Sequence, residues 1–200
     1  NGMIATMSDA PLTGTVALLS DAPLEELIGV VEVLAQEGVA NLSLPVDSAS
    51  LEELVALYGQ RIRIGVHGAA KAPATLATQG ADFILPDFVT PDIATIAEAL
   101  ALACYATAMT PTEVATALTM PVTGVQLRPA EVVGPIMAEH LQHMGLIDKT
   151  IPRGGLIPFT AKQWLSAGAP AVCVGRHLIG DALKGGDLAA LRDRCRNLRN

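Results

Sequence analysis

Short apolar runs alternate along the chain with longer stretches in which apolar residues recur every three or four positions. Runs that are apolar throughout are typical of strands buried on both faces, as in a parallel sheet covered by helices. The longer stretches have the spacing of amphipathic helices, which would pack on such a sheet. The eight runs predict strands over 15–19, 41–46, 61–66, 82–85, 103–108, 122–127, 149–152 and 171–175.

Helix boundary signals occur between these runs. Gly38 and Gly80 end two of the helical stretches, and Thr110, Pro111 and Glu113 have the pattern of a capping box with proline at the first helical position. The predicted helices cover 21–37, 50–58, 73–79, 90–100, a segment that begins at 110, 133–144, 160–166 and 188–198. Each predicted strand is therefore followed by a helix.

Eight strand-then-helix units predict an α/β fold, a single-domain (β/α)8 TIM barrel. The 200 residues lie at the small end of the range for this fold. An open doubly wound sheet is the competing architecture, but no G-x-G-x-x-G follows the first strand and the units are evenly spaced. We expect residues 1–14 to be an N-terminal extension and residues 15–200 to form the barrel.

Composition narrows the classes of function. Hydrophobic residues make up 50% of the chain and charged residues 16%, which permits a large core. A net charge of −7 and an aromatic content of 3% argue against a nucleic-acid partner, because backbone phosphates attract cations and single strands stack on aromatic rings. No apolar run has the ~20 residues that span a bilayer, and no secretory signal pattern opens the chain. The three cysteines form no C-x-x-C pair and give no disulfide framework, so we expect a reduced, cytoplasmic protein. Without a membrane-spanning run, we also expect no membrane partner.

Candidate chemistry lies where the predicted strands end, which is the active face of a TIM barrel. Arg128, Arg153 and Arg176 come at or just after the ends of the sixth, seventh and eighth strands. If those ends lie side by side, the guanidinium groups favour a phosphate or carboxylate ligand, and nearby glycines let backbone N–H groups approach it. The predicted residues for binding a small anionic metabolite are Arg128, Arg153, Gly154, Gly155, Gly175, Arg176 and His177.

Acid–base and amine chemistry have fewer candidates. His67 directly follows the third run and is the candidate proton carrier. Asp47 and Asp87 could join it around a metal, but the spacing has no metal-site signature, so we predict no metal and no cofactor. Amine catalysis needs a lysine inside the barrel, and only Lys71 is near the active face.

Several motifs lie in the register of a known family. They are Thr110-Pro111-Thr112-Glu113, Pro129-Ala130-Glu131, Pro152-Arg153-Gly154-Gly155-Leu156 and Val174-Gly175. On these motifs the chain resembles the 2-keto-3-deoxy-6-phosphogluconate / 4-hydroxy-2-oxoglutarate (KDPG/KHG) aldolases from about residue 16 to residue 191. Those proteins are small class I (β/α)8 barrels and usually trimers. The resemblance therefore implies a carbon–carbon lyase that assembles as a homotrimer.

The positions that hold the family's chemistry differ in this sequence. The resemblance places Gln126 where the family has the lysine that forms a Schiff base with the keto acid. It places Ser43 at the general-base glutamate and Asp47 at the arginine that binds the substrate carboxylate. The other departures add cationic or imidazole groups to the mouth, at His67, Arg128, Arg153, Arg176 and His177.

We therefore predict a diverged family member that lacks the Schiff-base lysine. Its remodelled site would bind a phosphorylated or polycarboxylate metabolite and would not catalyse the family's aldol reaction. If the site catalyses a different reaction, His67 is the candidate proton carrier. Two alternatives stay open. One is an active 2-keto acid aldolase that uses Lys71 or a non-covalent route. The other is a non-catalytic binding or structural subunit.

Overall fold

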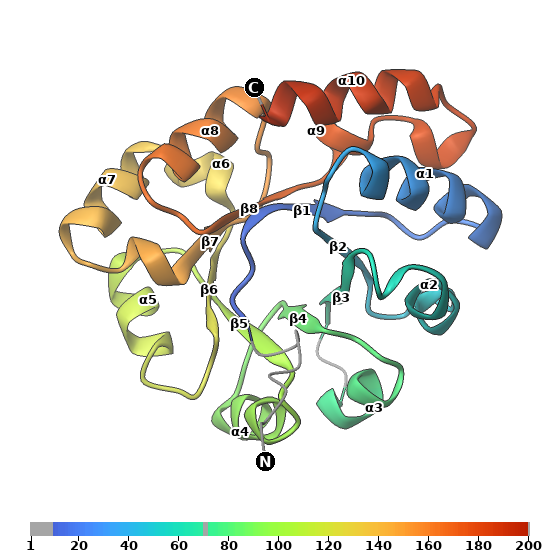
Figure 1. The fold of residues 1–200 in the computed structure, drawn as a ribbon. Helices are drawn as coiled ribbons and strands as arrows, with labels where there is room; N and C mark the ends of the chain where they lie inside the picture. The colour runs from blue at the N-terminus through green and yellow to red at the C-terminus, as the bar shows by residue number, and fades with distance from the viewer. Residues whose placement is uncertain (1–9, 70–71, 200) are drawn as a thin grey trace, which may run out of the picture.

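Eight parallel strands surround the centre of the molecule, and helices surround the strands (Figure 1). The computed structural model describes residues 10–69 and 72–199. The strands are β1 (Gly14–Leu18), β2 (Asn41–Pro45), β3 (Arg63–Gly68), β4 (Phe83–Pro86), β5 (Ala103–Ala108), β6 (Gly124–Leu127), β7 (Thr150–Pro152) and β8 (Ala171–Val174). Their order is β7-β6-β5-β4-β3-β2-β1-β8, and a parallel bridge from Arg153 to Cys173 joins the last pair of neighbours. The predicted (β/α)8 barrel is confirmed.

Ten α-helices in the described part of the chain connect the strands. They are α1 (Leu24–Gln36), α2 (Leu51–Tyr58), α3 (Pro73–Thr78), α4 (Pro91–Ala99), α5 (Pro111–Ala117), α6 (Ala130–Val133), α7 (Ile136–His143), α8 (Pro158–Ser166), α9 (Arg176–Ile179) and α10 (Leu188–Arg199). The predicted capping box is present, because the Thr110 hydroxyl accepts from the Glu113 N–H and the Glu113 carboxylate accepts from the Thr110 N–H. None of the described helices is long and apolar enough to cross a membrane.

The structure corrects three predicted boundaries. β3 begins at Arg63 and continues through Gly68, so His67 lies inside the strand and pairs with Pro45 of β2. A 3-10 helix over Ile147–Lys149 precedes β7, which starts only at Thr150. The helix predicted over 133–144 is α7, which starts only at Ile136; Val133 ends the separate short helix α6, since Gly134 with a φ of 67° and Pro135 lie between the two.

Two apolar clusters follow from the alternation of side chains along the strands. One fills the space between strands and helices, and it includes Leu42, Leu44 and Trp164. The other fills the barrel interior and consists of Leu12, Val16, Phe83, Leu85, Ala103, Tyr105, Ile151, Ala171 and Cys173. Cys104 and Cys173 are both buried and free.

The described part of the predicted extension, residues 10–13, crosses the end of the barrel where the strands begin (Figure 1). Leu12 is fully buried in the interior cluster, and its N–H donates to the Tyr105 hydroxyl at 2.7 Å. The Arg63 guanidinium donates to the Ala10 carbonyl at 2.9 Å. This segment therefore covers part of the end of the barrel where the strands begin.

Gly65 on β3 permits close contact inside the barrel, and Gly65→Ala is expected to lower the free energy of unfolding by about 1–3 kcal/mol. A Cβ there would overlap the Phe83 carbonyl oxygen and ring. Gly29→Ala in α1 is the matched control, since its Cβ would meet only Leu188 Cδ1 at 3.6 Å; it should add roughly 0.5–1 kcal/mol through helix propensity. Urea unfolding measures both variants. Equal stability of the two would contradict the role given to Gly65.

Candidate active site at the carboxyl ends of the strands

The three arginines predicted to gather do lie on neighbouring elements. β7 pairs with β6 on one side and approaches β8 on the other, so the segments that hold Arg128, Arg153 and Arg176 are adjacent. Their side chains nevertheless occupy different surroundings. Arg153 is buried with 7% of its surface exposed, Arg128 is half-buried at the rim, and Arg176 is exposed at the start of α9.

Gln126 lies in the barrel interior and is fully buried. Its Nε2 group donates to the Pro86 carbonyl at 2.6 Å and to the Tyr105 carbonyl at 3.2 Å. Its Oε1 atom accepts from Arg153 Nη1 at 2.7 Å. The amide therefore forms hydrogen bonds with β4, with β5 and with Arg153 just after β7. These partners determine its orientation.

Arg153 is a buried cation that contacts only neutral acceptors. Its Nη1 group donates to Gln126 Oε1 and to the Leu85 carbonyl at 3.1 Å. No carboxylate of the described residues lies within ion-pair distance of it. Burial lowers the pKa of the Arg153 guanidinium, and the Arg128 charge adds to that effect. Arginine still stays protonated, so Arg153 is a buried positive charge without a direct ion pair, although the Asp87 charge acts on it in the favourable direction.

His67 and Ser43 lie close to this charge. The Ser43 hydroxyl and His67 Nδ1 are 2.9 Å apart, and Ser43 is fully buried. Burial lowers the pKa of His67 to about 4, and the neighbouring Arg153 charge acts in the same direction. The imidazole is therefore neutral near pH 7. A pKa this low makes it a weak general base, although a neutral imidazole still donates or accepts one hydrogen bond at each nitrogen.

Arg128 forms an ion pair with Asp87 at the rim of the mouth. Both side chains are more than a third exposed, so the pair contributes little to stability. Asp87 is thereby engaged by a guanidinium. Among the described residues, no three His, Cys, Asp or Glu side chains are placed to hold a metal ion together.

The glycine loop lines a pocket of ≈ 290 Å³ beside the mouth, and Cys173 of the interior cluster borders the same pocket. Gly154 and Gly155 have φ angles of 110° and 60°, a region that favours glycine. The lining residues include Gly154, Gly155, Gly175, Arg176, His177 and Glu131. Glu131 packs directly over Gly155, because a Cβ on that glycine would coincide with the Glu131 carboxylate. A carboxylate therefore shares the pocket predicted for an anion.

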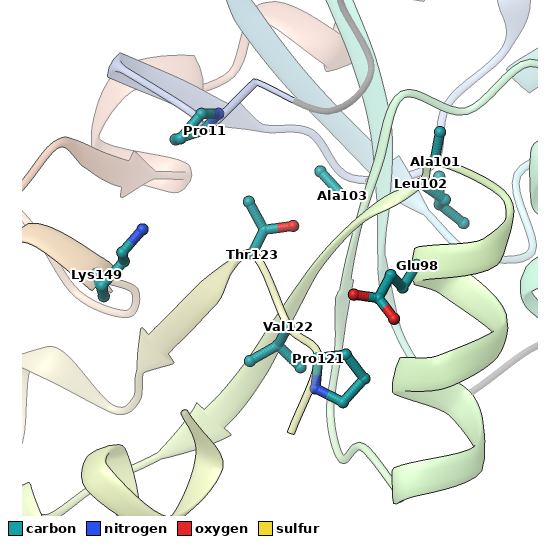
Figure 2. A pocket seen from close by; sticks show the side chains of 9 residues that line it. All are labelled: Pro11, Glu98, Ala101, Leu102, Ala103, Pro121, Val122, Thr123 and Lys149. Carbon is teal, nitrogen blue, oxygen red and sulfur yellow. The ribbon is translucent and has the colours of Figure 1, made fainter. Parts of the chain in front are cut away.

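Another pocket, of ≈ 400 Å³, lies at the opposite end of the barrel (Figure 2). Its lining residues Leu102, Thr123 and Lys149 all come just before strands begin. Glu98 also lines it, and Lys149 thus lies far from the carboxyl ends of the strands. Lys71, the lysine predicted near the active face, lies outside the described residues.

Sequence reasoning did not identify the acceptors that hold the interior residues. The carbonyl groups of Leu85, Pro86 and Tyr105 accept from Gln126 or Arg153. Every residue has a backbone carbonyl group, so residue type does not indicate which carbonyl groups will accept these hydrogen bonds. Ser43 was considered only as a replaced base, and its contact with His67 depends on the register that places Ser43 beside Gly65, two residues before His67.

Comparison with known proteins gives the same architecture. A family model described as KDPG and KHG aldolase matches residues 5–193, whereas no curated protein matches the chain. A 4-hydroxy-2-oxoglutarate/2-dehydro-3-deoxyphosphogluconate aldolase structure is 25% identical, with a TM-score of 0.78 and 92% of each chain covered.

Two further aldolase structures are less similar in sequence and show the shared fold. The KDPG aldolase from Legionella pneumophila, with pyruvate captured as a covalent carbinolamine, is 17% identical with a TM-score of 0.78; 96% of this chain and 98% of that chain are covered. The 2-keto-3-deoxy-6-phosphogluconate aldolase of Zymomonas mobilis with 3-phosphoglycerate is 18% identical with a TM-score of 0.75; the coverage is 94% and 91%.

Proposed function

The chain belongs to the KDPG and KHG aldolase family, and on that premise we propose that its barrel mouth binds a small metabolite bearing a phosphate or several carboxylates. We propose further that it does so without the imine-forming aldol reaction. Family membership supports a carbon–carbon lyase of the aldolase type as the class of any activity.

The buried charge of Arg153 is the observation that supports anion binding. A buried cation is normally paired with an anion, because taking a charge out of water without a counter-charge is unfavourable. Arg153 has neutral acceptors only among the described residues. A bound carboxylate or phosphate would supply the missing counter-charge.

The surroundings of Gln126 support the absence of an imine. An amide nitrogen is not a nucleophile toward a ketone, and this one is already engaged with two carbonyl groups. Lys149 is at the far end of the barrel, Lys162 lines a groove between α7 and α8, and Lys184 lies in a 3-10 helix before α10. An aldolase that uses Lys71 is the alternative that the test below distinguishes.

The glycine loop supports a second anionic contact. Gly154 and Gly155 line the same pocket as Arg176 and His177. The Glu131 carboxylate opposes an anion there. We therefore expect Glu131→Gln to tighten phosphate binding, whereas Arg176→Ala should weaken it.

Homotrimer formation is part of the proposal through the family resemblance. Large apolar side chains exposed on α6 to α8 support it, namely Val132, Ile136 and Phe159.

Anion binding and imine formation are tested on the same protein. Thermal-shift measurements with phosphate, glycerol 3-phosphate, 2-oxoglutarate and citrate should find at least one stabilising ligand; at ~100 times its Kd it adds roughly 2.7 kcal/mol. Arg153→Ala should abolish the shift given by 2-oxoglutarate or citrate, and Arg61→Ala, which removes a surface ion pair with Glu32, should not. Incubation with pyruvate and borohydride should leave the intact mass unchanged.

Each alternative has its own contrary result. A pyruvate adduct that disappears in Lys71→Arg would support the active aldolase. A chain that none of the anions stabilises would support a structural subunit without a small-molecule site.

A further inference from the structure

We propose that Arg153 forms a carboxylate subsite in the centre of the barrel, separate from the glycine loop, and that Gln126 is its positioning residue. This inference rests on the proposed function, because it assigns one chemical group of the anionic ligand to one place in the mouth. The ligand class that follows is a molecule with a carboxylate at one end and a second anionic group within reach of the glycine loop.

The first argument is that only one edge of the guanidinium is occupied. Arg153 Nη1 donates to Gln126 Oε1 and to the Leu85 carbonyl. Nε and Nη2 have no hydrogen-bond partner among the described residues, and neither is sealed from solvent. These two N–H groups form the parallel pair of donors that matches the two oxygens of a carboxylate.

The second argument is that Gln126 fixes the direction of this free edge. Its own amide is held by carbonyl groups on β4 and β5, so its Oε1 is a rigid acceptor. Because Oε1 and the Leu85 carbonyl both bind Nη1, the guanidinium plane cannot turn without losing a hydrogen bond. Gln126 is also neutral, and so it orients the cation without cancelling its charge.

The third argument concerns charge and favours a carboxylate over a phosphate at this position. The neighbouring His67 is held neutral by burial and by Arg153, and Ser43 is uncharged. A single buried guanidinium balances one negative charge. A phosphate dianion would need further donors, which the glycine loop with Arg176 and His177 can offer and the interior does not.

Titration calorimetry with three probes tests the separation of the two subsites. Pyruvate has a carboxylate only, glycerol 3-phosphate has a phosphate only, and 3-phosphoglycerate has both. Arg153→Lys keeps the positive charge but loses the two parallel N–H donors of the guanidinium. Pyruvate should therefore bind this variant about tenfold more weakly than wild type, whereas the affinity for glycerol 3-phosphate should stay within roughly threefold of wild type. Arg176→Ala should give the reverse pattern, and 3-phosphoglycerate should lose affinity in both variants.

Gln126→Glu tests the positioning role through selectivity. A glutamate would neutralise Arg153, so pyruvate binding should weaken by about tenfold or more while glycerol 3-phosphate binding is retained. A residue that served only the stability of the barrel would affect both probes alike. Gln126→Met, which removes the acceptor without adding charge, is the second variant if Gln126→Glu does not fold.

The outcomes separate this inference from the proposal beneath it. If pyruvate binds Arg153→Lys as it binds wild type, or if both monofunctional probes weaken equally, the separate subsite is wrong while anion binding stands. If no probe binds the wild-type chain, the proposed function fails and this inference fails with it.

Discussion

Replacing Gln126 by lysine is expected to lower the free energy of unfolding by about 3–5 kcal/mol, because it places two unpaired cations together in a buried site. Gln126 is fully buried, and its Oε1 is 2.7 Å from Arg153 Nη1. A lysine ammonium in that position would meet the guanidinium directly and remove one of its acceptors. The same repulsion would lower the pKa of the new lysine. Chemical denaturation of Gln126→Lys against wild type measures the loss.

A second substitution shows whether repulsion is the cause. Gln126→Lys combined with Arg153→Met should recover at least half of the lost stability, although Arg153→Met alone leaves the Gln126 oxygen without its donor. The two changes should therefore be strongly non-additive, as expected for side chains in direct contact. Gln126→Met is the control for loss of the amide. Additive effects would show that Arg153 does not determine what residue 126 can be.

Gln126→Lys alone is also expected to give no aldol cleavage of a 2-keto-3-deoxy acid phosphate. The Ser43 hydroxyl is engaged with His67 Nδ1, and Asp47 is an exposed carboxylate that would repel a substrate carboxylate. Neither supplies the base or the carboxylate contact that the family resemblance assigns to those positions. Measurable cleavage by the single variant would contradict this account of the site.

The barrel was predictable because every strand is buried on both faces. Runs such as 103–108 and 171–174 contain no charged residue, and only a parallel sheet covered by helices buries them fully. The capping box at Thr110 was equally visible, since it depends on neighbouring residues alone. The division between α6 and α7 had a local signal too, in Gly134-Pro135, but the apolar spacing continues across it.

The grouping of the three arginines was predictable only in part. Strand order places Arg128, Arg153 and Arg176 on adjacent segments, as expected. The direction of each side chain depends on the pleat and on tertiary contacts. Arg153 is two residues after interior Ile151 and points inward, whereas Arg176 begins a helix outside. The predicted single pocket therefore divides into an interior site and the glycine loop.

The contacts that distinguish these two places involve partners far away in sequence. Arg153 reaches Leu85 across 68 positions, and Gln126 reaches Pro86 across 40. Glu131 lies over Gly155 because the chain after β6 packs on the loop after β7. The spacing of residues along the chain does not predict such tertiary contacts. They follow from barrel closure, which the sequence predicts only as an architecture.

Acidification is expected to destabilise the wild-type chain by about 2–3 kcal/mol more than His67→Gln between pH 7 and pH 4.5. The pKa of His67 is about 4 in the folded chain, because burial and then Arg153 disfavour the charged ring, and it is about 6.5 when unfolded. In that window the unfolded chain binds more protons than the folded one. The resulting stability is fully present above pH 6.5, is lost progressively as the pH falls from 6.5, and is gone below the folded pKa of about 4.

Urea unfolding at pH 7 and pH 4.5 separates this contribution from that of the carboxylates, because His67→Gln retains every acidic group and keeps a polar side chain beside Ser43. His140→Gln on α7 is the matched control, since His140 is exposed and its removal should leave the pH dependence of wild type unchanged. A bound carboxylate at Arg153 should offset part of the charge that depresses the His67 pKa, so saturating pyruvate should narrow the difference between wild type and His67→Gln. If both histidine variants lose stability in parallel with wild type, the pKa of His67 is not depressed by its surroundings and by the Arg153 charge.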